Sequence, residues 1–201
     1  MKEYGIRSDP RHRVHGSEVL CQGKIVRVER EQVSLPHGYE TAQEVVHLPP
    51  AVAIVPITVD DSGQRCVVLV EQFRNSVRGH MHEIPAGVVE EGEDYEDCAR
   101  RELEEETGFR AGKIQHIASL LMIPGTSAHR LHFFLAEDLS PGTQNLDQAE
   151  CLRVRSVELD PLVERLLKEA PGSTPIVDSK THLGLLHCWM LLAHREKGAH
   201  P

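Results

Sequence analysis

The sequence predicts an α+β fold or an α/β/α sandwich, preceded by a small N-terminal antiparallel β-meander. Short β-prone runs come first, a strongly periodic helical segment interrupts them at 93–106, and two more helical segments close the chain after further strands. This order favours one sheet covered by helices. With 201 residues, 40% of them hydrophobic, the chain is long enough for one domain with a sizeable core.

The N-terminal region divides into an arm and a meander. Residues 1–17 mix charge, proline and glycine without periodicity, which is typical of a flexible arm. In 18–48, β-prone runs flank a Pro-His-Gly turn signal at 36–38, and this pattern predicts two or three short strands. Residues 49–197 are then expected to form the main domain.

The main domain contains five predicted strands and three predicted helices. The strands are expected at 51–57, 66–70, 114–120, 131–136 and 151–157, and the helices at 93–106, 161–169 and 179–197. The first two strand segments are almost wholly apolar and are separated by the turn sequence Asp-Asp-Ser-Gly, so we expect them to be buried. Polar loops separate the last three strands.

Composition excludes several functional classes. The formal net charge of −9 argues against a nucleic-acid partner, because polyphosphate backbones are held by clustered Lys and Arg. No apolar run reaches the roughly 18 residues needed to span a bilayer, and the N-terminus lacks the apolar core of a secretion signal, so a cytoplasmic location without membrane contact is expected. Five scattered cysteines without a CxxC pair predict reduced thiols, and no HExxH spacing indicates zinc.

The most informative segment runs from Gly87 to Phe109, where a loop becomes an acidic helix. On a helical wheel Glu102 and Glu106 lie about 40° apart and point the same way as the apolar stripe, with Glu105 roughly 60° to the other side. Like charges at these spacings each oppose the helix by roughly 0.2–0.5 kcal/mol. An ordinary charged surface helix would turn its carboxylates away from the stripe, so we expect a cation among them.

The ligand type indicates which cation. Carboxylate oxygens with no nearby His or Cys favour Mg²⁺ or Mn²⁺, which proteins use with phosphate substrates. Arg101 is expected to pair with Glu105, four residues further on, and so to hold that side chain in place.

The spacing of the whole segment resembles a family signature. Gly87 is followed after five residues by Glu93, and after seven more by the run RELEEETGF at 101–109. This fits the Nudix box, GX5EX7REUXEEXGU, at every defined position. The resemblance implies an α+β fold of the Nudix type, an α/β/α sandwich with a mixed sheet. It also implies a metal site in which Glu102, Glu105 and Glu106 are ligands, with Glu93 in a supporting role.

Sequences flanking the box resemble the ADP-ribose pyrophosphatase group. Gln72 and Arg74 fit its QxR element, and the run Glu-Ile-Pro-Ala-Gly at 83–87 fits its E(L/I)PAG element. The resemblance implies that the Ala86 carbonyl also ligates metal and that Arg74, with Gln72 and Glu83, approaches the substrate. Pro124, fifteen residues after Phe109, resembles the marker proline of the ADP-ribose subgroup.

Two later segments extend the likeness to most of the chain. The run 150–154 (ECLRV) resembles a strand whose preceding loop carries a catalytic glutamate, which makes Glu150 the first candidate for the general base and Glu105 the second. A solvent-facing loop glutamate is the alternative for Glu150. The run 178–181 (DSKT) resembles the opening of the family's last helix.

Two departures from the group bear on the substrate. Relatives often carry a glutamate in the loop where this chain has Ala-His-Arg at 128–130, so His129 could alter contacts to the terminal sugar. Relatives also often place an aromatic ring near Ile25 and Val26 to stack on adenine, and this chain has none there. UDP-glucose, GDP-mannose or another nucleotide sugar is therefore kept as an alternative.

The resulting hypothesis is hydrolysis of ADP-ribose to AMP and ribose 5-phosphate with two or three Mg²⁺ (or Mn²⁺) ions. A non-catalytic Nudix domain that senses a nucleotide is the rival, although such domains usually have damaged boxes and here every acidic position is present. The resemblance also implies a homodimer in which segment 18–48 contacts the partner and helps to build its site. The preferred nucleotide, the metal, the number of ions and the base are left open by the sequence.

Overall fold

The computed structural model describes residues 6–148, 150–168 and 176–198. Contacts divide the chain into two compact units. The first contains the residues up to 49 together with 121–129, and the second contains 50–120 together with the residues from 130 onward. The unit boundary thus follows Pro49, and the short segment 121–129 belongs with the N-terminal unit.

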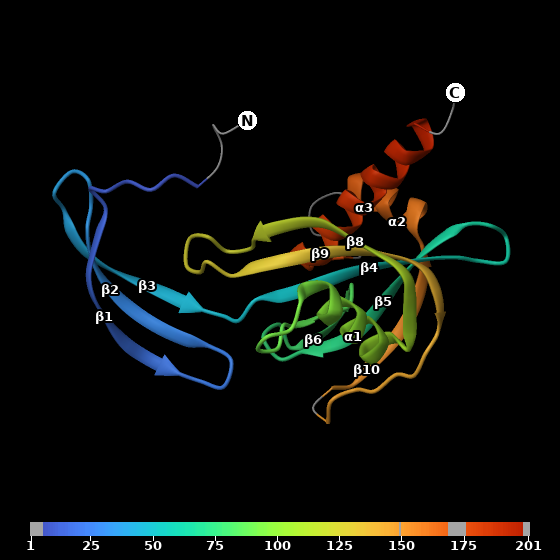
Figure 1. The fold of residues 1–201 in the computed structure, drawn as a ribbon, viewed down its shortest axis with the longest axis horizontal. Coiled ribbons are helices and arrows are strands. Elements are labelled where there is room, and N and C mark those ends of the chain that lie inside the picture. The colour runs from blue at the N-terminus through green and yellow to red at the C-terminus, as the bar shows by residue number, and fades with distance from the viewer. Residues whose placement is uncertain (1–5, 149, 169–175, 199–201) are drawn as a thin grey trace. The chain divides into compact units, whose positions relative to one another are not determined.

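The first unit contains a three-stranded antiparallel sheet, coloured blue in Figure 1. Its strands are β1 (Arg13–Gln22), β2 (Arg27–Ser34) and β3 (Glu40–His47), in the order β1-β2-β3. Gly38, with φ 86°, makes the turn between β2 and β3 by donating its N–H to the Leu35 carbonyl at 2.9 Å. The predicted antiparallel meander is confirmed, and β1 begins inside the range expected as an arm.

The second unit is built on a seven-stranded mixed sheet (Figure 1). Its strands are β4 (Ala51–Val59), β5 (Arg65–Arg74), β6 (Gly79–Glu83), β7 (Ala86–Val88), β8 (Phe109–Leu121), β9 (Arg130–Pro141) and β10 (Leu152–Glu158). The main order is β10-β5-β4-β9-β8, with β6 paired to β5 and β7 paired to β4. Because β4 pairs with β9 in parallel and with β5 and β7 antiparallel, the sheet is mixed as predicted.

Helices cover both faces of this sheet. They are α1 (Tyr95–Thr107), α2 (Leu159–Lys168) and α3 (Ser179–Gly198), and position 169 of the second predicted helix lies outside the described residues. Val52 and Ile54 of β4 pack in one core cluster with α1, whereas Val55 of the same strand contacts α3 near Gly184. Since alternate side chains of a strand point to opposite faces, α1 and α3 lie on opposite sides, which confirms the α/β/α sandwich.

Among the described residues, no helix is long and apolar enough to cross a bilayer.

Candidate functional site

Helix α1 carries the acidic side chains, and its ends are fixed by local sequence. Asp94 caps the N-terminus by accepting a hydrogen bond from Glu96 N at 2.8 Å, and Glu96 and Asp97 place negative charge in the first turn. Gly108 ends the helix in a left-handed conformation (φ 73°) and donates to the Glu104 carbonyl. The helix is anchored by its buried side chains Cys98, Ala99 and Leu103.

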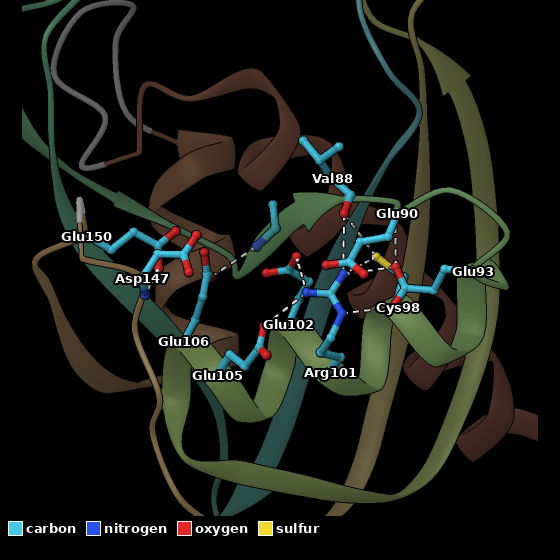
Figure 2. A network of polar contacts seen from close by, with 11 residues as sticks. Val88, Glu90, Glu93, Cys98, Arg101, Glu102, Glu105, Glu106, Asp147 and Glu150 are labelled. Atoms are coloured by element: carbon cyan, nitrogen blue, oxygen red, sulfur yellow. Dashed lines mark hydrogen bonds and ion pairs between the residues drawn. The ribbon is translucent and has the colours of Figure 1, made fainter. Parts of the chain in front are cut away.

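Arg101 is the centre of an ion-pair network on α1 (Figure 2). Its guanidinium binds both oxygens of Glu93, at 2.7 and 2.9 Å, and donates through Nη1 to Glu102 at 2.7 Å and to Glu105 at 2.9 Å. The pairing with Glu105 that was expected from the sequence is thus confirmed. Hydrogen bonding to Arg101 lowers the pKa of Glu93 to about 2.

Glu106 is the most buried carboxylate of the helix, with 5% of its surface exposed. Its Oε2 accepts a hydrogen bond from the backbone N–H of Ala86 at 3.1 Å. Burial raises the pKa of Glu106 to about 8, against the opposing effect of that hydrogen bond, and the charges of Glu102 and Glu150 raise it further. Burial also raises the pKa of Glu102, although Arg101 opposes the shift.

The turn formed by Ala86 and Gly87 lies directly against these carboxylates. A Cβ added at Gly87 would meet the carboxylate carbon of Glu102 at 1.8 Å, so only glycine leaves room for that side chain. The cradle therefore consists of the Ala86–Gly87 backbone on β7 and the Glu102 and Glu106 carboxylates on α1.

Glu150 lies on the loop before β10 and faces the same cradle. Figure 2 shows Glu150 and Asp147 beside Glu106, and the charge of Glu150 contributes to the raised pKa of both Glu102 and Glu106. The loop is folded back on itself, because Asp147 N donates to Glu150 Oε2 at 3.2 Å and Glu150 N donates to the Asp147 carbonyl at 2.9 Å. Asp147 was not singled out from the sequence, where it is one polar residue in a polar loop.

The oxygen donors of this cradle suit a hard cation chemically. Across 6–148, 150–168 and 176–198, however, no three His, Cys, Asp or Glu side chains converge closely enough to hold an ion. Each of the three carboxylates on α1 instead has a donor within the chain. Arg101 donates to Glu102 and Glu105, and the Ala86 N–H donates to Glu106. Burial raises the pKa of Glu106 more than the Ala86 N–H lowers it, so this contact alone stabilises the charged form poorly.

Arg74 and Glu83 form a bidentate pair in the second unit. Arg74 donates through Nε at 2.7 Å and Nη2 at 2.8 Å to the two oxygens of Glu83, whose side chain is only 4% exposed. The pair lies within electrostatic reach of the cradle, because the charge of Glu106 contributes to the raised pKa of Arg74. Gln72, two residues before Arg74 on β5, is opposite Leu152 of β10 in the sheet register.

Pro124 and His129 belong to the first unit, on the segment 121–129. There the Thr126 carbonyl accepts a hydrogen bond from Val46 N of β3 at 2.8 Å. Pro124 lines a hollow of about 570 Å³ between this segment and β3. His129 donates its backbone N–H to Ser127 Oγ at 3.1 Å, and its Nδ1 is buried without a hydrogen-bond partner among the described residues.

Comparisons with known proteins show the family to which the chain belongs. A family model described as the NUDIX domain matches residues 47–179. The chain is 37% identical to the "ADP-ribose pyrophosphatase" of Bacillus subtilis (strain 168) over 166 residues, which cover 82% of this chain and 85% of that protein.

A second relative and a solved structure extend the match over most of the chain. The "Methanol dehydrogenase activator" of Bacillus methanolicus is 31% identical over 183 residues, covering 90% of this chain and 94% of that protein. A crystal structure of an "ADP compounds hydrolase" superposes with a TM-score of 0.80 at 23% identity and covers 94% of this chain and 98% of that chain. At that identity the structural likeness supports the fold alone.

Proposed function

The chain belongs to the Nudix family of hydrolases, and on that premise we propose that it hydrolyses the pyrophosphate bond of ADP-ribose to give AMP and ribose 5-phosphate. The observation that carries the proposal is the approach of the Glu102 and Glu106 carboxylates on α1 to the Ala86–Gly87 turn. Glu106 is 5% exposed and burial raises its pKa to about 8, so its charged form is disfavoured unless a cation binds beside it. The relative named for ADP-ribose hydrolysis supports the choice of substrate.

Two or three Mg²⁺ (or Mn²⁺) ions would be held by the Ala86 carbonyl and by the carboxylates of Glu102, Glu105 and Glu106. When bound, such ions neutralise the diphosphate and lower the pKa of a water molecule. The all-oxygen donor set and the burial of Glu106 with only a backbone N–H as its donor support this assignment. In this proposal Arg101 keeps its contact with Glu93 and orients the neighbouring carboxylates.

Glu150 is proposed as the general base. The water oxygen attacks one phosphorus, the bridging P–O bond breaks, and the bridging oxygen leaves with the other phosphate. The Glu150 carboxylate accepts the proton that the water loses, with Glu105 as the second candidate. The position of Glu150 beside Glu106 supports this role, because a base must lie near the reacting water.

Arg74 is proposed to bind the substrate. Glu83 accepts hydrogen bonds from Nε and Nη2 of Arg74 and so holds the guanidinium in one orientation. In this orientation Nη1 can donate to a phosphate or ribose oxygen. Gln72, on the same strand, is proposed to contact the nucleotide end. Pro124 and His129 are proposed to contact the substrate from the segment 121–129.

A substrate panel tests the proposal. With Mg²⁺ or Mn²⁺, kcat/KM is measured for ADP-ribose, UDP-glucose, GDP-mannose and FAD. We expect the highest value for ADP-ribose, with metal-dependent release of AMP. A higher kcat/KM for UDP-glucose or GDP-mannose would show that the proposed substrate is wrong. Binding of a nucleotide without turnover of any compound would favour a sensing domain.

A variant then tests the metal site itself. Glu102→Gln removes one ligand charge and is expected to lower kcat/KM strongly at saturating Mg²⁺, with Glu91→Gln, an exposed glutamate, as the matched control. Near-full turnover by Glu102→Gln would overturn the role given to α1.

A further inference from the structure

The start of helix α3 holds a polar cluster around the buried Thr181 that the proposed chemistry does not use. Oδ2 of Asp178 accepts hydrogen bonds from Thr181 N at 3.0 Å, Thr181 Oγ1 at 2.6 Å and Lys180 Nζ at 2.9 Å. Thr181 is fully buried, and the Lys180 side chain is 14% exposed. The Asp178 contact with Thr181 N alone would cap the helix, so the side-chain contacts call for a second explanation.

These side chains connect α3 to the segment that carries the Ala86–Gly87 turn. Thr181 Oγ1 accepts a hydrogen bond from the backbone N–H of Ile84 at 2.9 Å, between residues 97 positions apart. Lys180 Nζ donates to Oε2 of Glu83, the carboxylate that also binds Arg74. The first turn of α3 thus forms hydrogen bonds with two consecutive residues of this segment, Glu83 and Ile84.

The packing around Ile84 leaves little freedom for that segment. A Cβ added at Gly184 of α3 would lie 2.8 Å from Ile84 Cδ1, so the helix backbone approaches this side chain closely. The next two residues are held in turn: the Pro85 carbonyl accepts from Ile54 N at 2.8 Å, and Ala86 N donates to Glu106. Thr181 is therefore the first of three successive backbone anchors that end at Glu106.

We propose that Thr181 is a positioning residue, whose hydroxyl fixes the Ile84 amide and thereby sets the Ala86–Gly87 turn against the carboxylates of α1. Lys180 is the second link, because it holds Glu83 and, through it, Arg74. This inference rests on the proposed function for its metal ligands. It assigns to the 178–181 motif a role in assembling the site rather than only in starting a helix.

A matched pair of variants tests the hydroxyl. Thr181→Val keeps the shape of the side chain and the backbone contact with Asp178 but removes the acceptor for Ile84 N–H, whereas Thr181→Ser keeps the hydroxyl. The readout is the affinity for Mn²⁺ alone, measured by calorimetry without substrate. We expect Thr181→Val to bind Mn²⁺ about 10-fold more weakly than the unaltered protein, and Thr181→Ser to recover most of the affinity.

Several outcomes would overturn the inference. One is a Thr181→Val protein that melts at a lower temperature but binds Mn²⁺ as the unaltered protein does. Another is a Thr181→Ser protein as weak as Thr181→Val. If Thr181→Val does not fold, Lys180→Met removes the link to Glu83 and is expected to weaken Mn²⁺ binding similarly, with unchanged affinity as the contrary result.

The same experiment separates this inference from the proposed function. His187→Ala, an exposed change on α3, serves as the control for both measurements. If the unaltered protein hydrolyses no nucleotide sugar, the proposed function fails, yet the Mn²⁺ affinities of the two Thr181 variants still decide the positioning role. If the unaltered protein is active and Thr181→Val matches it in affinity and kcat/KM, the positioning role alone fails.

Discussion

Two glutamates of the candidate site, Glu93 just before α1 and Glu106 near its end, experience opposite electrostatic environments. Glu93 is paired with the Arg101 guanidinium, and this contact lowers its pKa to about 2. Glu106 has the Ala86 N–H as its hydrogen-bond donor, and burial raises its pKa to about 8. Because Glu93 has a cationic partner and the buried Glu106 has none among its hydrogen-bond donors, a bound cation would stabilise the charged form of Glu106 most, beside Glu102.

This difference predicts how stability depends on pH. The folded pKa of Glu106, about 8, lies above the ordinary value of 4.5, so the stability it contributes is fully present below the ordinary value and is lost as the pH rises towards 8. With EDTA present, raising the pH from about 5 to about 8 should lower the free energy of unfolding of the unaltered protein, relative to Glu106→Gln, by about 3 kcal/mol. Urea titrations measure this difference.

Glu91→Gln, at an exposed position, is the control and should follow the unaltered protein at both pH values. Addition of Mg²⁺ at the higher pH should restore stability to the unaltered protein and leave Glu106→Gln largely unchanged. Identical pH profiles for the unaltered protein and Glu106→Gln would contradict the account of Glu106.

Gly87 offers a steric test of the same cradle. A methyl group at Gly87 would overlap the Glu102 carboxylate, since the added Cβ would lie 1.8 Å from its carboxylate carbon. Gly87→Ala should therefore displace Glu102 and reduce kcat/KM roughly 100-fold, the scale expected for a misplacement of about 1 Å. Gly16→Ala, where an added Cβ meets nothing within 4 Å, is the control. Equal activity of the two variants would refute the close approach.

Helices and strands with a clear local sequence pattern were predicted correctly. The two apolar runs form β4 and β5, and the periodic segment forms α1, which ends at Gly108 in a left-handed conformation. Strands β6 and β7 were missed, because their short sequences GHMHE and AGV have no strand pattern and they form by pairing with β5 and β4. Strand β1 was missed in part for the same reason, since all of its residues are exposed.

In the candidate site, too, the contacts set by local sequence were predicted and those set by long-range packing were not. The helical wheel predicted that the Glu106 carboxylate points toward the apolar side of α1, and its burial bears this out. The i,i+4 spacing also predicted the pairing of Arg101 with Glu105. The links of Thr181 and Lys180 to the β6–β7 segment could not be predicted, because they join residues 97 positions apart and depend on how α3 packs.

For the molecule as a whole, the N-terminal sheet lacks a core of its own. Among the described residues up to 49, Val33 is the only buried hydrophobic side chain. Large apolar side chains on or beside the strands are instead exposed, including Val14, Val19, Leu20 and Ile25. A small sheet that buries so few apolar side chains is marginally stable in water, so we expect a partner to cover this surface.

We predict that a second copy of the chain covers it. Sedimentation velocity at micromolar concentration should show a homodimer, and Val19→Glu with Leu20→Glu should shift the protein to monomer, because each change buries a charge at the contact. Leu167→Glu, at a 59% exposed position on α2, is the control and should leave the dimer intact. If partner strands also complete the site, the monomeric variant should lose activity on ADP-ribose, whereas a fully active monomer would confine catalysis to one chain. A monomeric unaltered protein would contradict the prediction outright.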